Sequence, residues 1–274
     1  MKKWTLSRIW EYCKVHPKVF AGALILFVFL ILSLLGQVWT PFSVTKMDPL
    51  SVSQSPSLLH IFGTDNFGRD VFSRVINGCG ITVLVALLTN LVGGGIGILV
   101  GSLTGYFGGS FDQILMRIND MLLSFPSVLL ALLLISFLGP GTLNVVLALG
   151  ILFIPSYARI ARGEVIRFKD RDFVRSARLQ GVSPLRIIFL HILPNARISL
   201  FTAAAIGFNN AVLAEASMSY LGLGLQPPTP SLGRMLFEAQ SYLLNCPWYA
   251  LFPGITIILM ILGAALLSEG LKES

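Results

Sequence analysis

The stretch from Arg171 to Asn195, RDFVRSARLQGVSPLRIIFLHILPN, lies between two apolar segments and is both basic and amphipathic. Phe173 and Ala177 are four residues apart, which places them on one face of a helix. Gly181 follows at a position where the C-terminus of a helix favours a residue that tolerates a positive φ. The stretch therefore predicts a short helix that ends at a glycine.

A second helix is predicted directly after this glycine. Ser183 and Pro184 are the preferred residue types for the N-cap and the first helical position, and Pro194 ends the helix. Apolar residues recur between them with the spacing i, i+3, i+4, i+7. This apolar stripe consists of Leu185, Ile188, Phe189 and Ile192. A helix–glycine–helix hairpin with an apolar face, in a chain that is otherwise membrane-bound, is expected to bind a soluble partner.

The rest of the sequence is that of a polytopic membrane protein. Of the 274 residues, 54% are hydrophobic and only 12% are charged, a combination that soluble domains rarely show. Six apolar segments are each long enough to cross a hydrocarbon core of about 30 Å. They lie near residues 19–38, 80–106, 116–138, 143–161, 198–221 and 250–268. The first is longer than the roughly 7–15 residues of a signal-peptide core, and no clear cleavage site follows it, so it is predicted to be an uncleaved transmembrane helix.

The distribution of positive charge predicts the orientation of these helices. With the N-terminus inside, only Lys46, Arg69, Arg74 and Arg234 of the 20 Lys and Arg residues lie outside. The opposite orientation would place the basic region from Arg159 to Arg197 outside. Both termini and the hairpin are therefore predicted to be cytoplasmic. This bias also explains the net charge of +7 without a nucleic-acid partner.

The sequence lacks the residues for several kinds of chemistry. A Walker A loop requires a lysine preceded by glycine, and no lysine in the chain has this context. The chain is therefore not predicted to be an enzyme, and energy for transport has to come from another polypeptide. Its three histidines and three cysteines are widely spaced, so no metal site and no cofactor are predicted. Cys13 is expected to be cytoplasmic, whereas Cys79 and Cys246 both lie near the outer face, and their pairing stays open.

Glycines recur at every fourth residue within the 80–106 segment, on one face of the predicted helix. Two helices approach closely where neither carries a side chain. We interpret this face as a static packing surface, within the subunit or against another one, and a sliding contact in a gate is the alternative. The glycines are Gly93, Gly97, Gly101 and Gly105.

Polar residues within the apolar segments are candidates for the translocation path, because ionisable groups in a membrane are costly. Glu215 is the deepest of them, and Asn209 and Asn210 belong to the same segment. The three do not form one narrow stripe. Glu215 either lines the path or bonds a neighbouring helix, and both alternatives stay open.

Two segments outside the membrane contain further signals. Asp70 and Arg74 have the favourable i, i+4 order for a short amphipathic helix that leads into the second span. Thr64 or Asp65 is expected to cap this helix. The proline-rich segment 226–230 is expected to be stiff, since proline restricts φ.

The hairpin stretch resembles the cytoplasmic EAA loop of permease subunits of ABC importers. Gly181, Leu193 and Pro194 match the glycine and the final Leu-Pro of that loop, and Ala177 matches the last residue of Glu-Ala-Ala. The positions that depart from the pattern are Arg175, Ser176 and His191.

Two other stretches narrow this resemblance to the peptide and nickel permease branch. Residues 63–74, GTDNFGRDVFSR, resemble the GTDxxGRDxxSR signature of that branch. Residues 221–230, LGLGLQPPTP, resemble its second signature. With the apolar segments between them, the resemblance covers nearly the whole chain.

The resemblance implies a type I ABC importer permease fold with six transmembrane helices and a cytoplasmic coupling-helix hairpin. Residues 1–78 would form the N-terminal tail, the first transmembrane helix and an extracytoplasmic segment, and residues 79–274 the permease core. The residues expected to couple to the ATPase are Arg175, Ser176, Ala177, Gly181, Ser183, Leu185, Ile188, Phe189 and Pro194.

The implied assembly is a heterodimer with a second permease, two cytoplasmic ATPase subunits and an extracytoplasmic solute-binding protein. It would lie in a bacterial or archaeal cytoplasmic membrane and import peptides, or a metal chelate such as nickel, by ATP-driven alternating access. Two other classes remain as alternatives: an ATP-independent secondary transporter or channel subunit, and a structural membrane scaffold.

Overall fold

The computed structural model describes residues 16–273 and consists of helices joined by short loops. Cys13 and the basic residues before it lie outside this range. Within the described range no β-strand forms, and Thr64 and Asp70 make one isolated bridge. The long helices are α2 (Pro17–Val38), α3 (Val71–Phe107), α6 (Thr142–Phe168), α9 (Arg197–Tyr220) and α11 (Pro247–Glu273). The shorter ones are η1 (Pro49–Ser51), α4 (Gly109–Ser124), α5 (Ser127–Leu138), α7 (Asp172–Leu179), α8 (Pro184–Arg186), η2 (Ile187–Ile192), α10 (Leu232–Ala239) and η3 (Gln240–Tyr242).

The five long helices are each long and apolar enough to cross a membrane. Helices α4 and α5 make a sixth span if the two are taken together, but they are bent by 94° at the residues between them. The prediction of an all-α membrane fold is confirmed. The prediction of one continuous helix near 116–138 is wrong. Pro126 has no N–H to continue the helix, and it keeps Phe125 extended, with φ −87° and ψ 142°.

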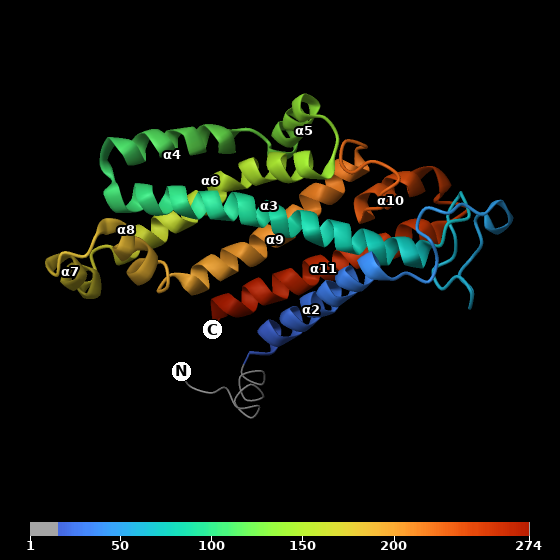
Figure 1. Cartoon of the computed structure of the whole chain (residues 1–274), viewed down its shortest axis with the longest axis horizontal. Coiled ribbons are helices and arrows are strands. Elements are labelled where there is room, and N and C mark those ends of the chain that lie inside the picture. The colour runs from blue at the N-terminus through green and yellow to red at the C-terminus, as the bar shows by residue number, and fades with distance from the viewer. Residues whose placement is uncertain (1–15, 274) are drawn as a thin grey trace.

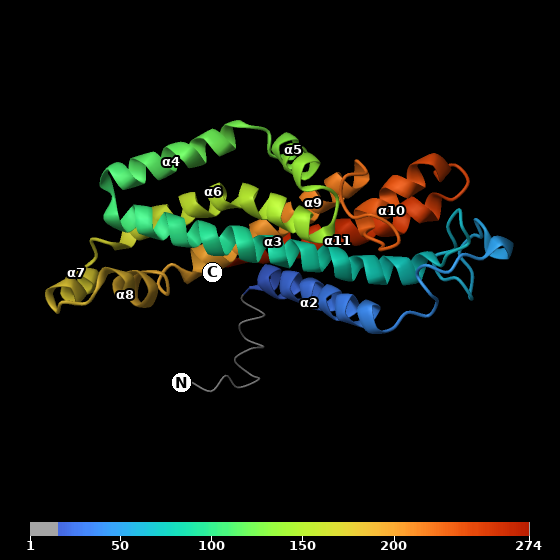
Figure 2. The same cartoon turned by 45° about the horizontal axis from the view of Figure 1, so that its top comes forward.

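The bundle has two distinct ends. Figure 1 shows the α7–α8 hairpin at one end and the 39–70 segment with α10 at the other. Helix α3 runs from the second end to the first, and α11 and α2 lie beside one another along it, as the rotated view in Figure 2 also shows. Each loop therefore returns the chain to one of two opposite ends, as expected of a membrane bundle.

Helix α3 begins nine residues before the apolar segment that predicted it. The Asp70 side chain accepts a hydrogen bond from the N–H of Ser73 at 2.7 Å and is the N-cap of α3. The prediction of a separate short helix capped by Thr64 or Asp65 is therefore wrong, because Asp70 caps the long helix itself and Arg74 lies in its first turn. Helix α3 also runs without a break across the expected boundary between residues 78 and 79.

The glycine face of α3 packs against α6 in the most extensive contact between two helices of the bundle. A Cβ added at Gly93 or Gly97 would lie 2.6 Å from a Cβ of α6, and one added at Gly101 would overlap the carbonyl oxygen of Ala158. Successive glycines of α3 face successive turns of α6 in the same order along the chain, so the two helices run parallel. The α6 residues that they meet, in the same order, are Gly150, Ile154, Ala158 and Arg162.

Gly101→Leu should disrupt this seam, because the new side chain would collide with the α6 backbone. Overpacking costs about 1–3 kcal/mol, and more where the opposing atoms are backbone. We expect a lower melting temperature in detergent and loss of the monodisperse folded species in size-exclusion chromatography.

Gly95→Leu is the matched control, because a Cβ at Gly95 on the same helix meets no atom within 4 Å. Equal stability of the two variants would contradict the packing role of the glycine face.

Candidate functional site

The hairpin predicted from the sequence is present as α7, α8 and η2, between α6 and α9. Gly181 has φ +76°, in the left-handed region where glycine is favoured. Its N–H donates to the carbonyl of Arg178 at 3.0 Å, and the N–H of Val182 donates to Ala177 at 3.1 Å. These two bonds close the end of α7, so the glycine sets the direction in which the chain leaves that helix.

One face of the hairpin is buried against the rest of the protein. On α7 this face consists of Val174 and Ala177, whereas Phe173 is 40% exposed. On the second helix the predicted stripe is divided. Ile188 and Ile192 are buried, and Leu185 and Phe189 are 54% and 43% exposed.

The winding of the second helix explains this division. Residues Ile187–Ile192 form a π-helix, and the N–H of Leu193 donates to the carbonyl of Ile188 at 2.9 Å, five residues back. A π-turn is wider than the 3.6 residues of an α-turn. It therefore brings Ile187 onto the buried face together with Ile188 and Ile192, and rotates Phe189 toward solvent.

The nine residues expected to couple to an ATPase therefore fall into two groups. Ala177 and Ile188 are buried within the subunit. The exposed group consists of Arg175, Ser176, Gly181, Ser183, Leu185, Phe189 and Pro194. Ser183 occupies the N-cap position, but its side chain makes no capping bond, and its carbonyl accepts from the N–H of Ile187 at 3.0 Å.

The buried face attaches the hairpin to the ends of α3 and α6. Val165 of α6 lies in the same apolar cluster as the hairpin isoleucines, and Tyr106 of α3 packs against it. The Arg178 guanidinium donates to the Tyr106 hydroxyl at 3.3 Å, and Lys169 Nζ donates to the carbonyl of Gly105 at 3.4 Å. The hairpin is thereby attached to the two helices that the glycine seam joins.

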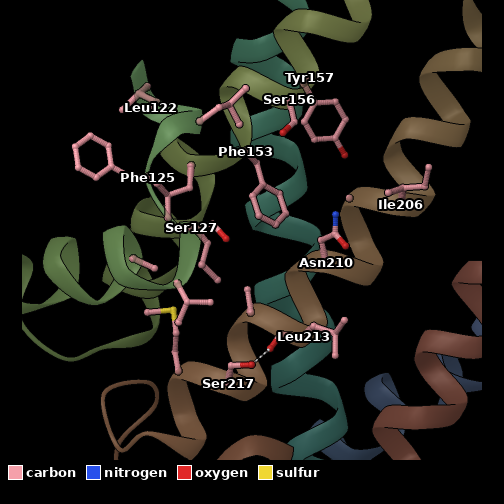
Figure 3. Close-up of a pocket in the computed structure, with 18 of the residues that line it drawn as sticks. Leu122, Phe125, Ser127, Phe153, Ser156, Tyr157, Ile206, Asn210, Leu213 and Ser217 are labelled. Carbon is pink, nitrogen blue, oxygen red and sulfur yellow. Dashed lines mark hydrogen bonds between the residues drawn. The ribbon is translucent and has the colours of Figure 1, made fainter. Parts of the chain in front are cut away.

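A cavity of about 550 Å³ lies between the α4–α5 break, α6 and α9. Figure 3 shows Phe125 and Ser127 on one side of it, Phe153 and Ser156 on α6, and Asn210 on α9. Of the three residues expected on a translocation path, Asn210 lines this cavity, whereas Asn209 and Glu215 do not.

Glu215 instead bonds α9 to α3. Its carboxylate is fully buried and accepts hydrogen bonds from the Thr82 hydroxyl at 3.0 Å and from the Ser219 hydroxyl at 2.7 Å. Of the two interpretations left open by the sequence, this geometry corresponds to the bond between helices. Asn209 is partly buried, and its Oδ1 has no hydrogen-bond partner among the described residues.

A cluster of ionic side chains lies at the end of the bundle opposite the hairpin. The Glu238 carboxylate on α10 is 3.0 Å from the Arg69 guanidinium and 3.1 Å from that of Arg74. Arg69 also pairs with Asp65 at 2.6 Å, and the Tyr249 hydroxyl of α11 donates to Glu238 at 2.6 Å. The cluster therefore joins the 39–70 segment to the first turns of α3 and α11 and to the last turn of α10.

Sequence reasoning did not identify this cluster. Arg74 was expected to pair with Asp70, but Asp70 is occupied by capping α3 and by His60 Nδ1 at 2.9 Å. The sequence did contain one indication of it. Two arginines lie outside the membrane, and buried arginines need acidic partners. Their partner Glu238 is 164 residues from Arg74, a separation that no local pattern reveals.

The two cysteines near this end, Cys79 and Cys246, are free thiols in the structure, and both are buried. The pairing that the sequence left open therefore does not occur between them here.

Comparison with known proteins identifies the family. The binding-protein-dependent transport system inner membrane component family matches residues 97–272. This chain belongs to it. The match covers most of the α3–α6 seam, the whole hairpin, and helices α9 to α11.

Similar permeases match over nearly their full length. The dipeptide transport system permease protein DppC of Alkalihalophilus pseudofirmus is 35% identical over 95% of this chain and 86% of its own length. The glutathione transport system permease protein GsiD of Salmonella typhimurium is 40% identical over 96% of this chain and 87% of its own. GsiD of Escherichia coli O6:H1 is 36% identical over 97% and 88%.

The chain is thus a permease subunit of an ABC importer, a multi-pass inner-membrane component that translocates rather than an enzyme. Membership of a binding-protein-dependent system implies ATPase and solute-binding partners. The prediction of this family from the hairpin and the two signatures is confirmed.

Glu238→Gln should destabilise the permease, because it leaves two buried guanidinium groups with one carboxylate fewer. Removing one partner of a buried ion pair costs on the order of 3 kcal/mol. We expect a clear drop in melting temperature in detergent. Glu269→Gln is the matched control, since Glu269 is 58% exposed in its pair with Lys18 and exposed pairs contribute little.

The effect of Glu238→Gln on stability should depend on pH in a definite direction. Burial raises the pKa of Glu238, but the hydrogen bond from Tyr249 and the charges of Arg74 and Arg69 outweigh it and hold that pKa below the usual range. A carboxyl group with a lowered pKa stabilises the fold fully above the unfolded pKa of about 4.3, and this contribution is lost as pH falls through the folded pKa. The difference between wild type and Glu238→Gln should stay constant from about pH 7 to pH 5 and shrink below about pH 4. A difference that grows on acidification would contradict the ion cluster.

Proposed function

We propose that this permease pairs with a second homologous permease and imports short peptides by alternating access, driven by two cytoplasmic ATPase subunits. The relatives named for dipeptide and glutathione transport support a peptide as cargo over the metal chelate that the sequence left open. An extracytoplasmic binding protein delivers the peptide, and the hairpin receives the movement of the ATPases.

The division of the hairpin into a buried and an exposed face is the observation that carries this proposal. A hairpin that only packed within the subunit would bury Leu185 and Phe189, and one that only bound a partner would leave Ile187, Ile188 and Ile192 exposed. Each face instead has its own apolar set. The exposed set suits a groove on a soluble partner, and the buried set connects that partner to α3 and α6.

The orientation is part of the proposal. The basic residues of the hairpin and of the adjoining end of α6 support a cytoplasmic hairpin. With up to six spans in the bundle, the two chain termini then lie on the same side as the hairpin. The 39–70 segment and the ion cluster lie on the extracytoplasmic side.

A cysteine-labelling scan tests this orientation in intact cells. Single cysteines at the exposed positions 228 and 229 and within 51–57 should react with a membrane-impermeant maleimide from outside. Cysteines at positions 168–183 should react only after the membrane is permeabilised. Labelling of the Gly181 region from outside would reverse the proposed topology.

Gly181→Val tests the coupling. A β-branched residue is strongly disfavoured at φ +76°, so the second helix should leave α7 in another direction. A Cβ at this position meets no atom within 4 Å, so the subunit itself should still insert and assemble. We expect transport and substrate-stimulated ATP hydrolysis by the reconstituted complex to be lost.

Gly139→Val is the matched control, because Gly139 also has a positive φ, +82°, with no atom within 4 Å of an added Cβ, but lies far from the hairpin. This variant should retain coupled transport. Wild-type coupling in Gly181→Val would disprove the role of the hairpin. Uptake by the chain without its ATPases would favour the ATP-independent carrier instead.

A further inference from the structure

The exposed face of the hairpin carries more apolar side chains than the predicted stripe contained. Besides Leu185 and Phe189 it includes Leu190, the next residue along the second helix, and Leu179 at the end of α7. Leu179 is 90% exposed. Large apolar side chains that gather in the open on one small element typically mark a site of interaction.

Arginines accompany this apolar set. Between residues 171 and 197 the chain has five arginines and a single acidic residue, Asp172. Arg178 is held within the subunit, because it donates to the Tyr106 hydroxyl and lies 5.1 Å from the centre of that ring. The other four are exposed and make no ion pair with any residue in the described range 16–273. They are Arg171, Arg175, Arg186 and Arg197.

Two of these arginines lie next to the exposed leucines. Arg175 and Leu179 are four residues apart on α7, and Arg186 and Leu190 are four apart on the second helix. Each arginine is therefore on the same side of its helix as an exposed leucine. Arginine beside apolar and aromatic side chains is the composition that protein–protein interfaces favour.

The direction of this face distinguishes a protein partner from lipid. The opposite, buried face meets the ends of α6 and α3 through Val165 and Tyr106. The exposed face is therefore directed away from the bundle, and Figure 2 shows α7 beyond the end of α3. An amphipathic helix that binds lipid lies in the membrane plane with its apolar face toward the bilayer. The hairpin thus favours a soluble protein over lipid headgroups as its occupant.

We propose that the ATPase groove that receives this hairpin is acidic, with carboxylates that pair with Arg175 and Arg186 around the contact of the exposed leucines. The charge match then determines which ATPase this permease accepts. The inference rests on the proposed coupling through the hairpin and assigns a chemistry to the partner's surface.

The physical reason is the loss of water when the partner binds. A guanidinium group that is covered without a counter-charge is costly, whereas a carboxylate can bond it through two parallel N–H groups. A neutral or basic groove would leave both arginines unpaired. Arg175 also stands where the EAA pattern has glutamate, so the sign of the charge at this position is reversed in this chain.

The experiment measures binding of the purified ATPase to the permease pair in nanodiscs of phosphatidylcholine, which carries no net charge. A fluorophore attached through Gln180→Cys, an exposed position, reports on this hairpin alone. Cys13→Ser and a second permease without cysteine make the label specific, because Cys79 and Cys246 are buried.

The variants Arg175→Lys, Arg175→Ala and Arg175→Glu change the charge in steps. At about 0.1 M salt we expect binding within about threefold of wild type for the first, about fivefold weaker for the second and about thirtyfold weaker for the third. The loss in Arg175→Glu should shrink to about fivefold near 1 M salt, where the Debye length falls to about 3 Å. The same order is expected for the corresponding variants of Arg186.

Arg117→Glu is the matched control, because Arg117 is an exposed arginine of α4 and lies outside the hairpin. This variant should bind the ATPase as wild type does. All variants should keep the wild-type melting temperature, since neither Arg175 nor Arg186 makes an ion pair within the described part of the subunit.

The other outcomes are distinguishable. If the ATPase does not bind the wild-type hairpin, the proposed coupling fails and this inference fails with it. If wild type binds but the three Arg175 variants bind alike, the coupling contact stands and the acidic groove is overturned. Tighter binding of Arg175→Glu would indicate a basic groove and would also overturn it. A loss that appears only in nanodiscs containing phosphatidylglycerol would assign the arginines to lipid headgroups instead.

Discussion

The close parallel packing of α3 on α6 is the contact on which the other features of this permease depend. In a membrane no hydrophobic force drives one helix onto another, so close backbone approach has to provide the contact through dispersion and shape. Four glycines at intervals of one turn make that approach possible. Because the helices are parallel, their C-terminal ends lie side by side, and both are available to hold the hairpin that follows α6.

The hairpin uses this arrangement as a platform. Ile187 and Ile192 lie in one apolar cluster with Val165, and Arg178 contacts Tyr106, so the hairpin is attached to both helices of the seam. The same two helices meet again near mid-span, where Asn90 of α3 and Tyr157 of α6 are bonded behind the cavity. The hairpin and the cavity thus lie at two positions along one helix pair.

The carboxylates of Glu215 and Glu238 are both paired with side chains of other helices. Glu215 is bonded by two hydroxyls, and Glu238 by two arginines and a tyrosine, so each joins elements that are distant in sequence. Other buried polar atoms, among them Oγ1 of Thr89, Oγ of Ser102 and Oδ1 of Asn209, have no hydrogen-bond partner in the described part of the chain. The paired groups hold the bundle together.

Local signals in the sequence determined the membrane class, the hairpin with its glycine and the four-residue glycine period, because each depends on residues within a few turns of one another. The bend at Pro126 was equally local but concealed by the apolar run around it. Tertiary structure alone decided the partner of Arg74, the bonding of Glu215 and which face of the hairpin is buried. The first two depend on contacts between helices that are far apart in sequence. The third depends on the π-turn that rotates Phe189 outward, which a sequence pattern with the α-helical period of 3.6 residues does not reveal.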